Sequence, residues 1–422
     1  MKLHITLITM ILTTNLFCQE LKTIIPIEGE TFDFGIEVQN DWKKRDQLLE
    51  DLANEKKSWD NLTEEENELF EKYDETYESM WDVEGGGCSW YCGAGEYSVT
   101  TSSELSSNGK LDYKAKNLTD FSYQTAWVEG KKGYGIGEFI NFSFAPTHPR
   151  VTTIIFANGY VKSEKAWKDN SRVHKLKMLI NNEPYAIIEL KDIYSKQIIE
   201  LEKPLGNSDR KDFDKLKEKD NWNIKFEILS IYKGDKYDDT AISEIYFDGL
   251  DVHCLAKGTL ITMSDRTLKK IEDLKVGDEI LSYNKETGEY ESSIIKELAS
   301  QIHKDLINIE FSNGIQLTCT KDHPFLAKNL SWTSMNPKKT ERDYEINDVI
   351  QLKVRTKVRN LKSELEVVKI TEIKEEQITY TIVDLSKNKT FVANGIITGI
   401  EKLRVPTMYK NNSGLIAKTK VK

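Results

Sequence analysis

A cysteine opens a segment of short predicted strands about three-fifths of the way along the chain. Cys254 lies in HCLAKGTLITMSDRTLKKIEDLKVGDEILSYN, from His253 to Asn284, where Gly, Asp and Asn separate short apolar runs. A thiol at the first residue of a domain can attack the preceding carbonyl and convert the amide to a thioester, an N-to-S acyl shift. The departing nitrogen then needs a proton, which an imidazole can supply near neutral pH. The His253–Cys254 bond is therefore a candidate site of self-cleavage.

Composition places the chain among globular proteins with more than one domain. Its 422 residues are 39% hydrophobic and 30% charged, and the formal net charge is −10. This acidity argues against a nucleic-acid partner, because neutralising phosphates requires a basic face. The 18 Tyr and 8 Trp residues favour a β-rich or ligand-binding extracellular protein.

The first residues are typical of a secretory signal peptide. In MKLHITLITMILTTNLFCQE, Lys2 precedes a short apolar run that is too short to span a bilayer, and we expect a signal over residues 1–19. No later segment has the length of a membrane helix, so we expect no transmembrane segment. The protein is expected to be secreted, or to lie at the cell surface or in the periplasm. A lipid anchor on Cys18 is the alternative, although Phe17 is a poor residue before a lipidation site.

Four cysteines follow the expected signal peptide: Cys88, Cys92, Cys254 and Cys319. Cys88 and Cys92, in GGGCSWYCG, are close enough to form a small disulfide in an oxidising compartment. The same spacing could be half of a metal site, but no matching Cys or His pair supplies a second half. Cys254 and Cys319 then stay unpaired.

Hydrophobic patterning predicts a mainly β chain with a short helical start. Residues 20–85 form an acidic helical segment, in which charges fill the spaces between apolar residues at helical intervals. Short alternating runs predict an antiparallel β-sandwich of jelly-roll type over residues 86–252 and a second all-β domain over residues 254–400. A basic tail, 401–422, closes the chain.

The sandwich segment resembles a known family. The stretches TAWVEG, GYGIGE and YDDTAISEI are similar to the NADase-type glycan-binding module, a relative of the discoidin and galactose-binding-like sandwiches. The resemblance implies a carbohydrate ligand, and a ligand patch would contain Trp127, Glu129, Tyr134 and Trp167, unless these aromatic residues are core.

The same resemblance implies a metal ion. In related sandwiches calcium joins the first loop to the last strand, and the matching residues are Asp120, Thr125 and Glu244. Their hard oxygen atoms suit Ca²⁺. The alternative is that Asp120 caps a turn and Glu244 lies on the surface.

The segment that begins with Cys254 resembles the Hint family, the self-processing domain of Hedgehog proteins and inteins. CLAKGTLITMSDRTLKKIEDLKVGDEILSYN is similar to its first block, LTCTKDHPF (317–325) to the T-x-x-H block, and YTIVDL (380–385) with TFVANGI (390–396) to the closing strands. By this resemblance His323 protonates the leaving amine, Thr320 polarises or stabilises the tetrahedral centre, and Asp384 orients Cys254 or accepts its proton. Cys319 is expected to be core and not a second nucleophile.

One departure from inteins limits the expected reaction. Inteins close with a His-Asn pair that cyclises, whereas Gly399 and Ile400 occupy those positions here and Glu401 follows. The sequence therefore predicts N-terminal cleavage without splicing. No cofactor is required, and the thioester is resolved by water, an amine or a thiol. Such a domain acts once and is not a multiple-turnover enzyme. A carbohydrate-binding or adhesion protein with an inactive Hint scaffold is the alternative, and delivery of a toxin payload is a third.

Overall fold

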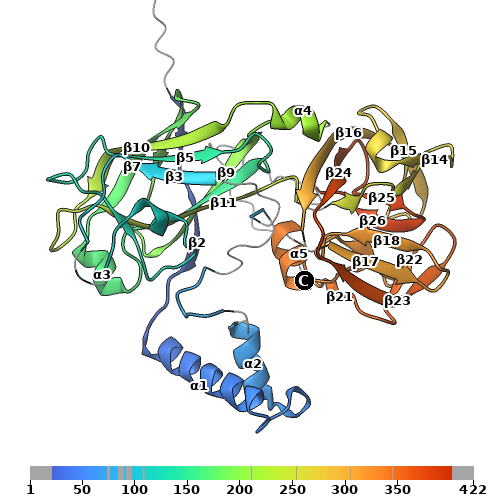
Figure 1. Cartoon of the computed structure of the whole chain (residues 1–422), viewed down its shortest axis with the longest axis horizontal. Helices are drawn as coiled ribbons and strands as arrows, with labels where there is room; N and C mark the ends of the chain where they lie inside the picture. The colour runs from blue at the N-terminus through green and yellow to red at the C-terminus, as the bar shows by residue number, and fades with distance from the viewer. Residues whose placement is uncertain are drawn as a thin grey trace, which may run out of the picture.

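The computed structural model describes residues 21–73, 77–83, 90–91, 97–107, 109, 111–210, 212–252, 254–304, 306–344 and 346–401. These residues form a helical hairpin and two β domains that lie side by side (Figure 1). Among them, no helix is both long and apolar enough to cross a membrane.

The first β domain is a sandwich of two sheets. One sheet has the spatial order β1 (Thr23–Ile24), β8 (Glu183–Glu189), β7 (Arg172–Ile180), β10 (Trp222–Tyr232), β5 (Phe139–Phe144) and β3 (Tyr97–Thr101). The other has the order β2 (Ile27–Thr31), β9 (Ser195–Leu205), β6 (Val151–Asn158), β11 (Ala241–Gly249) and β4 (Trp127–Val128). Buried residues alternate along β5 and β10, so each strand turns one face to the shared core, as period-2 patterning requires.

The helical prediction for residues 20–85 is wrong at its start. Residues 23–31 form β1 and β2, because β1 pairs with β8 in one sheet and β2 with β9 in the other. Helix α1 (Ile36–Ala53) and helix α2 (Glu64–Lys72) follow, and a capping box between Thr63 and Glu66 begins α2.

Short helices complete the sandwich and the second domain. They are α3 (Glu164–Asp169) and α4 (Phe213–Lys217) in the sandwich and α5 (Pro337–Tyr344) in the second domain, with 3₁₀ turns at η1 (Trp59–Asn61), η2 (Ala115–Leu118) and η3 (Ile271–Asp273).

The second β domain also has two sheets. The first has the order β15 (Glu279–Tyr283), β16 (Tyr290–His303), β24 (Gln377–Leu385), β12 (Leu255–Ala256), β18 (Gln316–Cys319), β17 (Leu306–Phe311), β23 (Glu364–Ile373) and β22 (Lys357–Arg359). The second has the order β14 (Leu268–Lys270), β13 (Leu260–Thr262), β25 (Thr390–Ala393), β26 (Ile396–Gly399), β19 (Phe325–Leu326), β20 (Trp332–Ser334) and β21 (Ile350–Gln351). Strand β12, which begins one residue after Cys254, thus lies between β24 and β18 inside the larger sheet.

Candidate active site

Cys254 is enclosed at the junction of the two β domains. Its exposed fraction is 0%, and the next residue, Leu255, pairs with Tyr380 of β24 on one side and Cys319 of β18 on the other. Cys319 is also fully buried and packs in the core of the second domain, which confirms that it is a core residue. A short strand held between two neighbours fixes the backbone of the nucleophile.

Thr320 contacts the amide nitrogen that self-cleavage would release. The Cys254 N–H donates to Thr320 Oγ1 at 3.4 Å, and the Thr320 N–H donates to the Cys254 carbonyl at 3.1 Å. From the resemblance to the Hint family, we expected Thr320 to polarise or stabilise the tetrahedral centre. The structure places its hydroxyl at the leaving nitrogen.

His323 lies in the turn that Thr320 begins. Its N–H donates to the Thr320 carbonyl at 3.2 Å, and its ring is buried and packs edge-on against Phe325. Nε2 lies 2.6 Å from Thr398 Oγ1, and Thr398 in turn donates to the Pro324 carbonyl at 2.7 Å. Since Thr398 uses its own proton there, Nε2 is the donor to Thr398. This bond fixes the orientation of the imidazole.

The structure does not bring Asp384 to Cys254. Tyr380, near the start of β24, pairs with Leu255, the residue after Cys254, whereas Asp384 lies near the other end of that strand. Its partly exposed carboxylate accepts from the Leu385 N–H at 2.9 Å and lies 3.5 Å from Lys389 Nζ. The expected orienting role of Asp384 is therefore not supported by its contacts, which are those of an ion-paired carboxylate at the strand end.

Other carboxylates surround the thiol. Burial raises the pKa of Cys254 far above its ordinary value, and the negative charges of Glu401, Asp251 and Asp322 act in the same direction. Glu401 is buried and accepts from the Val252 N–H at 2.7 Å, and Asp322 is paired with Lys339. The thiol is consequently protonated at rest, and its attack requires a base.

A buried ion cluster holds the chain just before the nucleophile. Asp251 has an exposed fraction of 0%, and its carboxylate accepts from Arg150 Nε at 2.9 Å and Nη2 at 2.6 Å. Arg210 Nε lies 3.0 Å from the same carboxylate. Asp251 has φ 74°, a left-handed conformation that is costly for most residues and tolerated best by Gly, Asn and Asp.

Both arginines belong to the sandwich and reach across to the second domain. Arg150 pairs with Glu297, and Arg210 Nη2 donates to Gln301 Oε1 at 3.0 Å. Ser300 Oγ donates to the Arg210 carbonyl at 2.5 Å. The two domains therefore share one polar interface around the segment that ends at Cys254.

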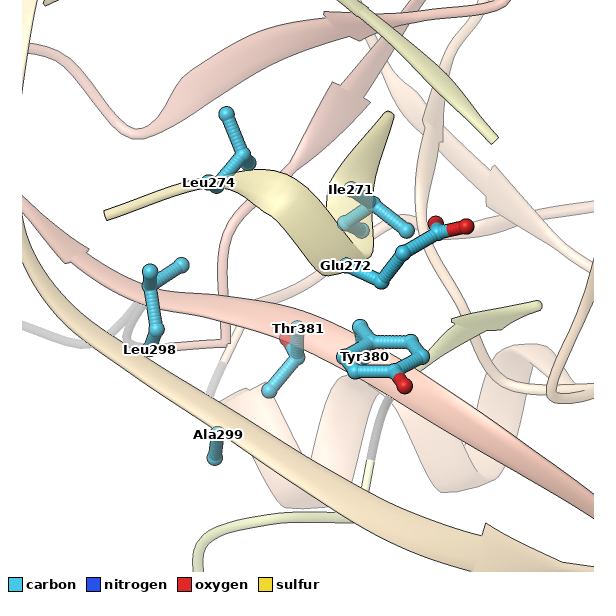
Figure 2. Close-up of a pocket in the computed structure, with 7 residues that line it drawn as sticks. All are labelled: Ile271, Glu272, Leu274, Leu298, Ala299, Tyr380 and Thr381. Atoms are coloured by element: carbon cyan, nitrogen blue, oxygen red, sulfur yellow. The ribbon is translucent and has the colours of Figure 1, made fainter. Parts of the chain in front are cut away.

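Two cavities lie beside β24, and Cys254 lines neither of them. The smaller, about 10 Å³, is lined by Leu298 and Ala299 of β16, Tyr380 and Thr381 of β24, and residues of η3 (Figure 2). This volume is close to that of one water molecule. The larger, about 530 Å³, lies between α4 and β24, and Asp209, Asp212 and Asp214 are among its lining residues.

The predicted calcium ligands are Asp120 and Thr125 in one loop and Glu244 within β11, and the structure brings them together. Thr125 Oγ1 donates to Asp120 Oδ2 at 2.7 Å, and the Ser122 N–H donates to Asp120 Oδ1 and Glu244 Oε1, both at 3.1 Å. Glu244 is buried, and Oε2 has no hydrogen-bond donor among the described residues. Burial and then the neighbouring Asp120 raise the pKa of Glu244 far above its usual value. Two close carboxylates and a hydroxyl fit a hard cation such as Ca²⁺.

We expect Ca²⁺ to bind between the carboxylates of Asp120 and Glu244 and to displace a proton from that pair. Because the folded pKa of Glu244 is raised, its contribution to stability is present at low pH and is lost as the pH rises through that pKa. At neutral pH, Ca²⁺ at a hundred times its Kd should then raise the free energy of unfolding by about 2.7 kcal/mol. Glu244→Gln should abolish the gain in calorimetry with and without chelator. An equal gain in both proteins would contradict the site.

The predicted ligand patch is partly wrong. Trp127 and Trp167 are core residues, with exposed fractions of 0% and 8%, and their indole N–H groups donate to the Ser103 and Asn158 carbonyls. Large aromatic rings in a sandwich are commonly buried between the sheets, and the sequence did not distinguish these two from surface rings.

Glu129 and Tyr134 do share one loop. Glu129 is buried, its Oε1 meets no hydrogen-bond donor within the described ranges, and burial raises its pKa. The partly exposed Tyr134 ring lies under Lys233, with Nζ 4.9 Å from its centroid. Gly135 closes the turn with φ +67°, and a Cβ there would lie 2.6 Å from Glu129 Cγ.

Several predicted features lie outside the described residues. They are the signal peptide, the Cys88–Cys92 disulfide, His253 and the tail beyond Glu401.

Two family models match the chain. Residues 90–248 match the NAD glycohydrolase translocation F5/8 type C domain, and residues 255–363 match the Ataxin-1 and HBP1 module. The first match covers the sandwich from β3 to β11, without β1 and β2. The second ends before β24 and β26, and β26 supplies Thr398 to the site.

Solved structures of inteins align with about a third of the chain. A DnaB intein from Synechocystis sp. PCC 6803 is 19% identical and covers 35% of this chain and 98% of its own, with a TM-score of 0.30. The intein-like domain from Clostridium thermocellum is also 19% identical and covers 35% of this chain and 99% of its own, with a TM-score of 0.30. The predicted fold class is confirmed in its architecture: the chain is mainly β, with a sandwich followed by a second all-β domain.

One curated relative matches a shorter region. The DNA-directed RNA polymerase III subunit rpc2 of Dictyostelium discoideum is 36% identical over 103 residues, which are 24% of this chain. The chain spans only 6% of the length of that relative.

Proposed function

We propose that the second domain cleaves the chain at the His253–Cys254 bond through a thioester. The observation that carries this proposal is the contact between Thr320 Oγ1 and the Cys254 amide nitrogen, in the turn that also orients His323. The Cys254 sulfur attacks the carbonyl carbon of residue 253, the C–N bond breaks, and the amine takes a proton from the His323 imidazolium.

A Cys254→Ala variant tests the proposal. We expect the wild-type chain to separate into two fragments on a denaturing gel, and thiols or hydroxylamine to increase the yield. The alanine variant should stay intact, because the nucleophile is absent. A wild-type chain that stays intact under every condition would support the alternative, in which the domain is an inactive scaffold.

Cleavage would release or transfer the sandwich without splicing. Ile400 occupies the position of the cyclising Asn, so no second cut follows at the end of β26. Water is the nucleophile that we propose to resolve the thioester, because Cys254 is fully buried and water is the smallest candidate. An amine or a thiol of a partner molecule would have to enter from outside the enclosed site.

For the sandwich we propose a carbohydrate ligand at the loop of Glu129 and Tyr134, in an exported protein. The match to the F5/8 type C domain supports the class of module, and a carboxylate beside a partly exposed aromatic ring is the chemistry that binds sugar hydroxyls and faces.

A further inference from the structure

Glu401 lies directly after β26, and its side chain contacts the segment that precedes Cys254. Glu401 is buried, and its carboxylate oxygen Oε1 accepts the Val252 N–H at 2.7 Å. Val252 is also buried, and one residue separates it from Cys254 in the sequence. The two bonded residues are 149 positions apart, so the fold brings the last residue that the structure describes in the second domain against the chain that enters this domain.

Separate contacts hold the two sides of the scissile bond. On the amine side, the Cys254 N–H and carbonyl are both bonded to Thr320, at 3.4 and 3.1 Å. On the acyl side, the bond to Glu401 holds the backbone of Val252, whereas the ion cluster holds a side chain one residue further away, that of Asp251. Attack requires the sulfur and the carbonyl carbon to be held in one geometry, so each side of the bond needs an anchor.

We propose that Glu401 positions the acyl side of the His253–Cys254 bond for attack by the Cys254 sulfur. This inference rests on the proposed function. Glu401 acts as a positioning residue: its carboxylate holds the Val252 N–H and thereby restrains the carbonyl of the next residue, while Thr320 holds Cys254. In this role the carboxylate takes no proton and forms no bond to the reacting atoms.

Other bonds hold the backbone at Glu401 independently of its side chain. The Glu401 N–H donates to the Ile382 carbonyl of β24 at 3.1 Å, and the Ile400 N–H donates to the Lys389 carbonyl at 3.1 Å. A substitution of the side chain therefore leaves this end of the domain in place and removes the contact with Val252. The anchor also forms only after β26 has paired with β25, so self-cleavage should wait for the last strand of the domain to fold.

Full-length variants test this role by the rate of thioester formation, measured as first-order cleavage in saturating dithiothreitol. Glu401→Leu and Glu401→Ala remove the acceptor and should slow this step by about 10²-fold, the effect of a small misplacement of the reacting atoms. Glu401→Gln keeps an oxygen acceptor for the Val252 N–H and should recover most of the rate. All three variants remove a negative charge that raises the pKa of the Cys254 thiol, so the comparison isolates the hydrogen bond.

Glu341→Leu is the matched control. The Glu341 carboxylate accepts the Val349 N–H at 2.8 Å in the same domain, at a backbone segment that does not lead to the scissile bond. This substitution therefore removes the same kind of contact and should leave the rate within a few-fold of wild type. Thermal unfolding in a Cys254→Ala background measures whether each variant is folded.

The comparison among the Glu401 variants decides the proposal. Equal rates for Glu401→Gln and for the Leu and Ala variants, with the wild type cleaved, would overturn the positioning role and leave the proposed function standing. A folded Glu401→Gln variant that is itself slowed by about 10²-fold would overturn the role in the same way, because its acceptor is retained. An uncleaved wild type would overturn both.

Discussion

Asp251→Asn should remove about 3 to 5 kcal/mol from the free energy of unfolding and slow self-cleavage. The carboxylate is fully buried between Arg150 and Arg210, and breaking a buried ion pair from one side leaves uncompensated charge in the interior. Asparagine tolerates the φ of 74°, so the substitution changes the charge and keeps the backbone conformation. Urea unfolding in a Cys254→Ala background measures the stability without interference from cleavage.

An exposed ion pair provides the control for this prediction. Glu164 and Lys168 pair across one turn of α3, and both side chains are more than half exposed. Glu164→Gln should therefore change the free energy of unfolding by no more than about 0.5 kcal/mol. If Asp251→Asn had an effect as small as that, the ion cluster would not hold the segment before Cys254.

His323→Gln should slow cleavage by about 10²- to 10⁴-fold, the range of a general acid. His323 lies in the turn that begins at Thr320, whose hydroxyl contacts the leaving nitrogen, and Thr398 of β26 fixes the His323 ring. Glutamine cannot donate a proton of comparable acidity. The rate is followed by gel densitometry after refolding.

His174→Gln is the control for His323. Its partly exposed ring lies 3.1 Å from Ser230 in the sandwich, and the rate should stay at the wild-type value. If the His323→Gln variant were cleaved at the wild-type rate, another group would have to protonate the amine.

The sequence predicted the local part of the site and not the part that tertiary structure builds. Cys254, Thr320 and His323 belong to two short blocks, and the pairing of β12 with β18 brings these blocks together. Thr398, which fixes the His323 ring, is an ordinary strand residue in sequence. Its relation to the site appears only when β26 pairs with β19.

The sequence also did not reveal which charged residues pair with each other or which aromatic residues are buried. Arg150 and Arg210 lie in loops of the sandwich, far in sequence from Asp251, and nothing local marks them as its partners. The same limit explains the incorrect assignments of Trp127 and Trp167, since an aromatic residue in a β-rich stretch fits the core and the surface equally well. Their burial depends on which strands face each other.

The mass of the upstream fragment after brief treatment with hydroxylamine tests the central claim most directly. A thioester at Cys254 predicts a fragment that ends at His253 and carries a hydroxamate, together with a second fragment that begins at Cys254 with a free amine and thiol. A fragment that ends at any other residue, or one produced equally from Cys254→Ala, would contradict the account.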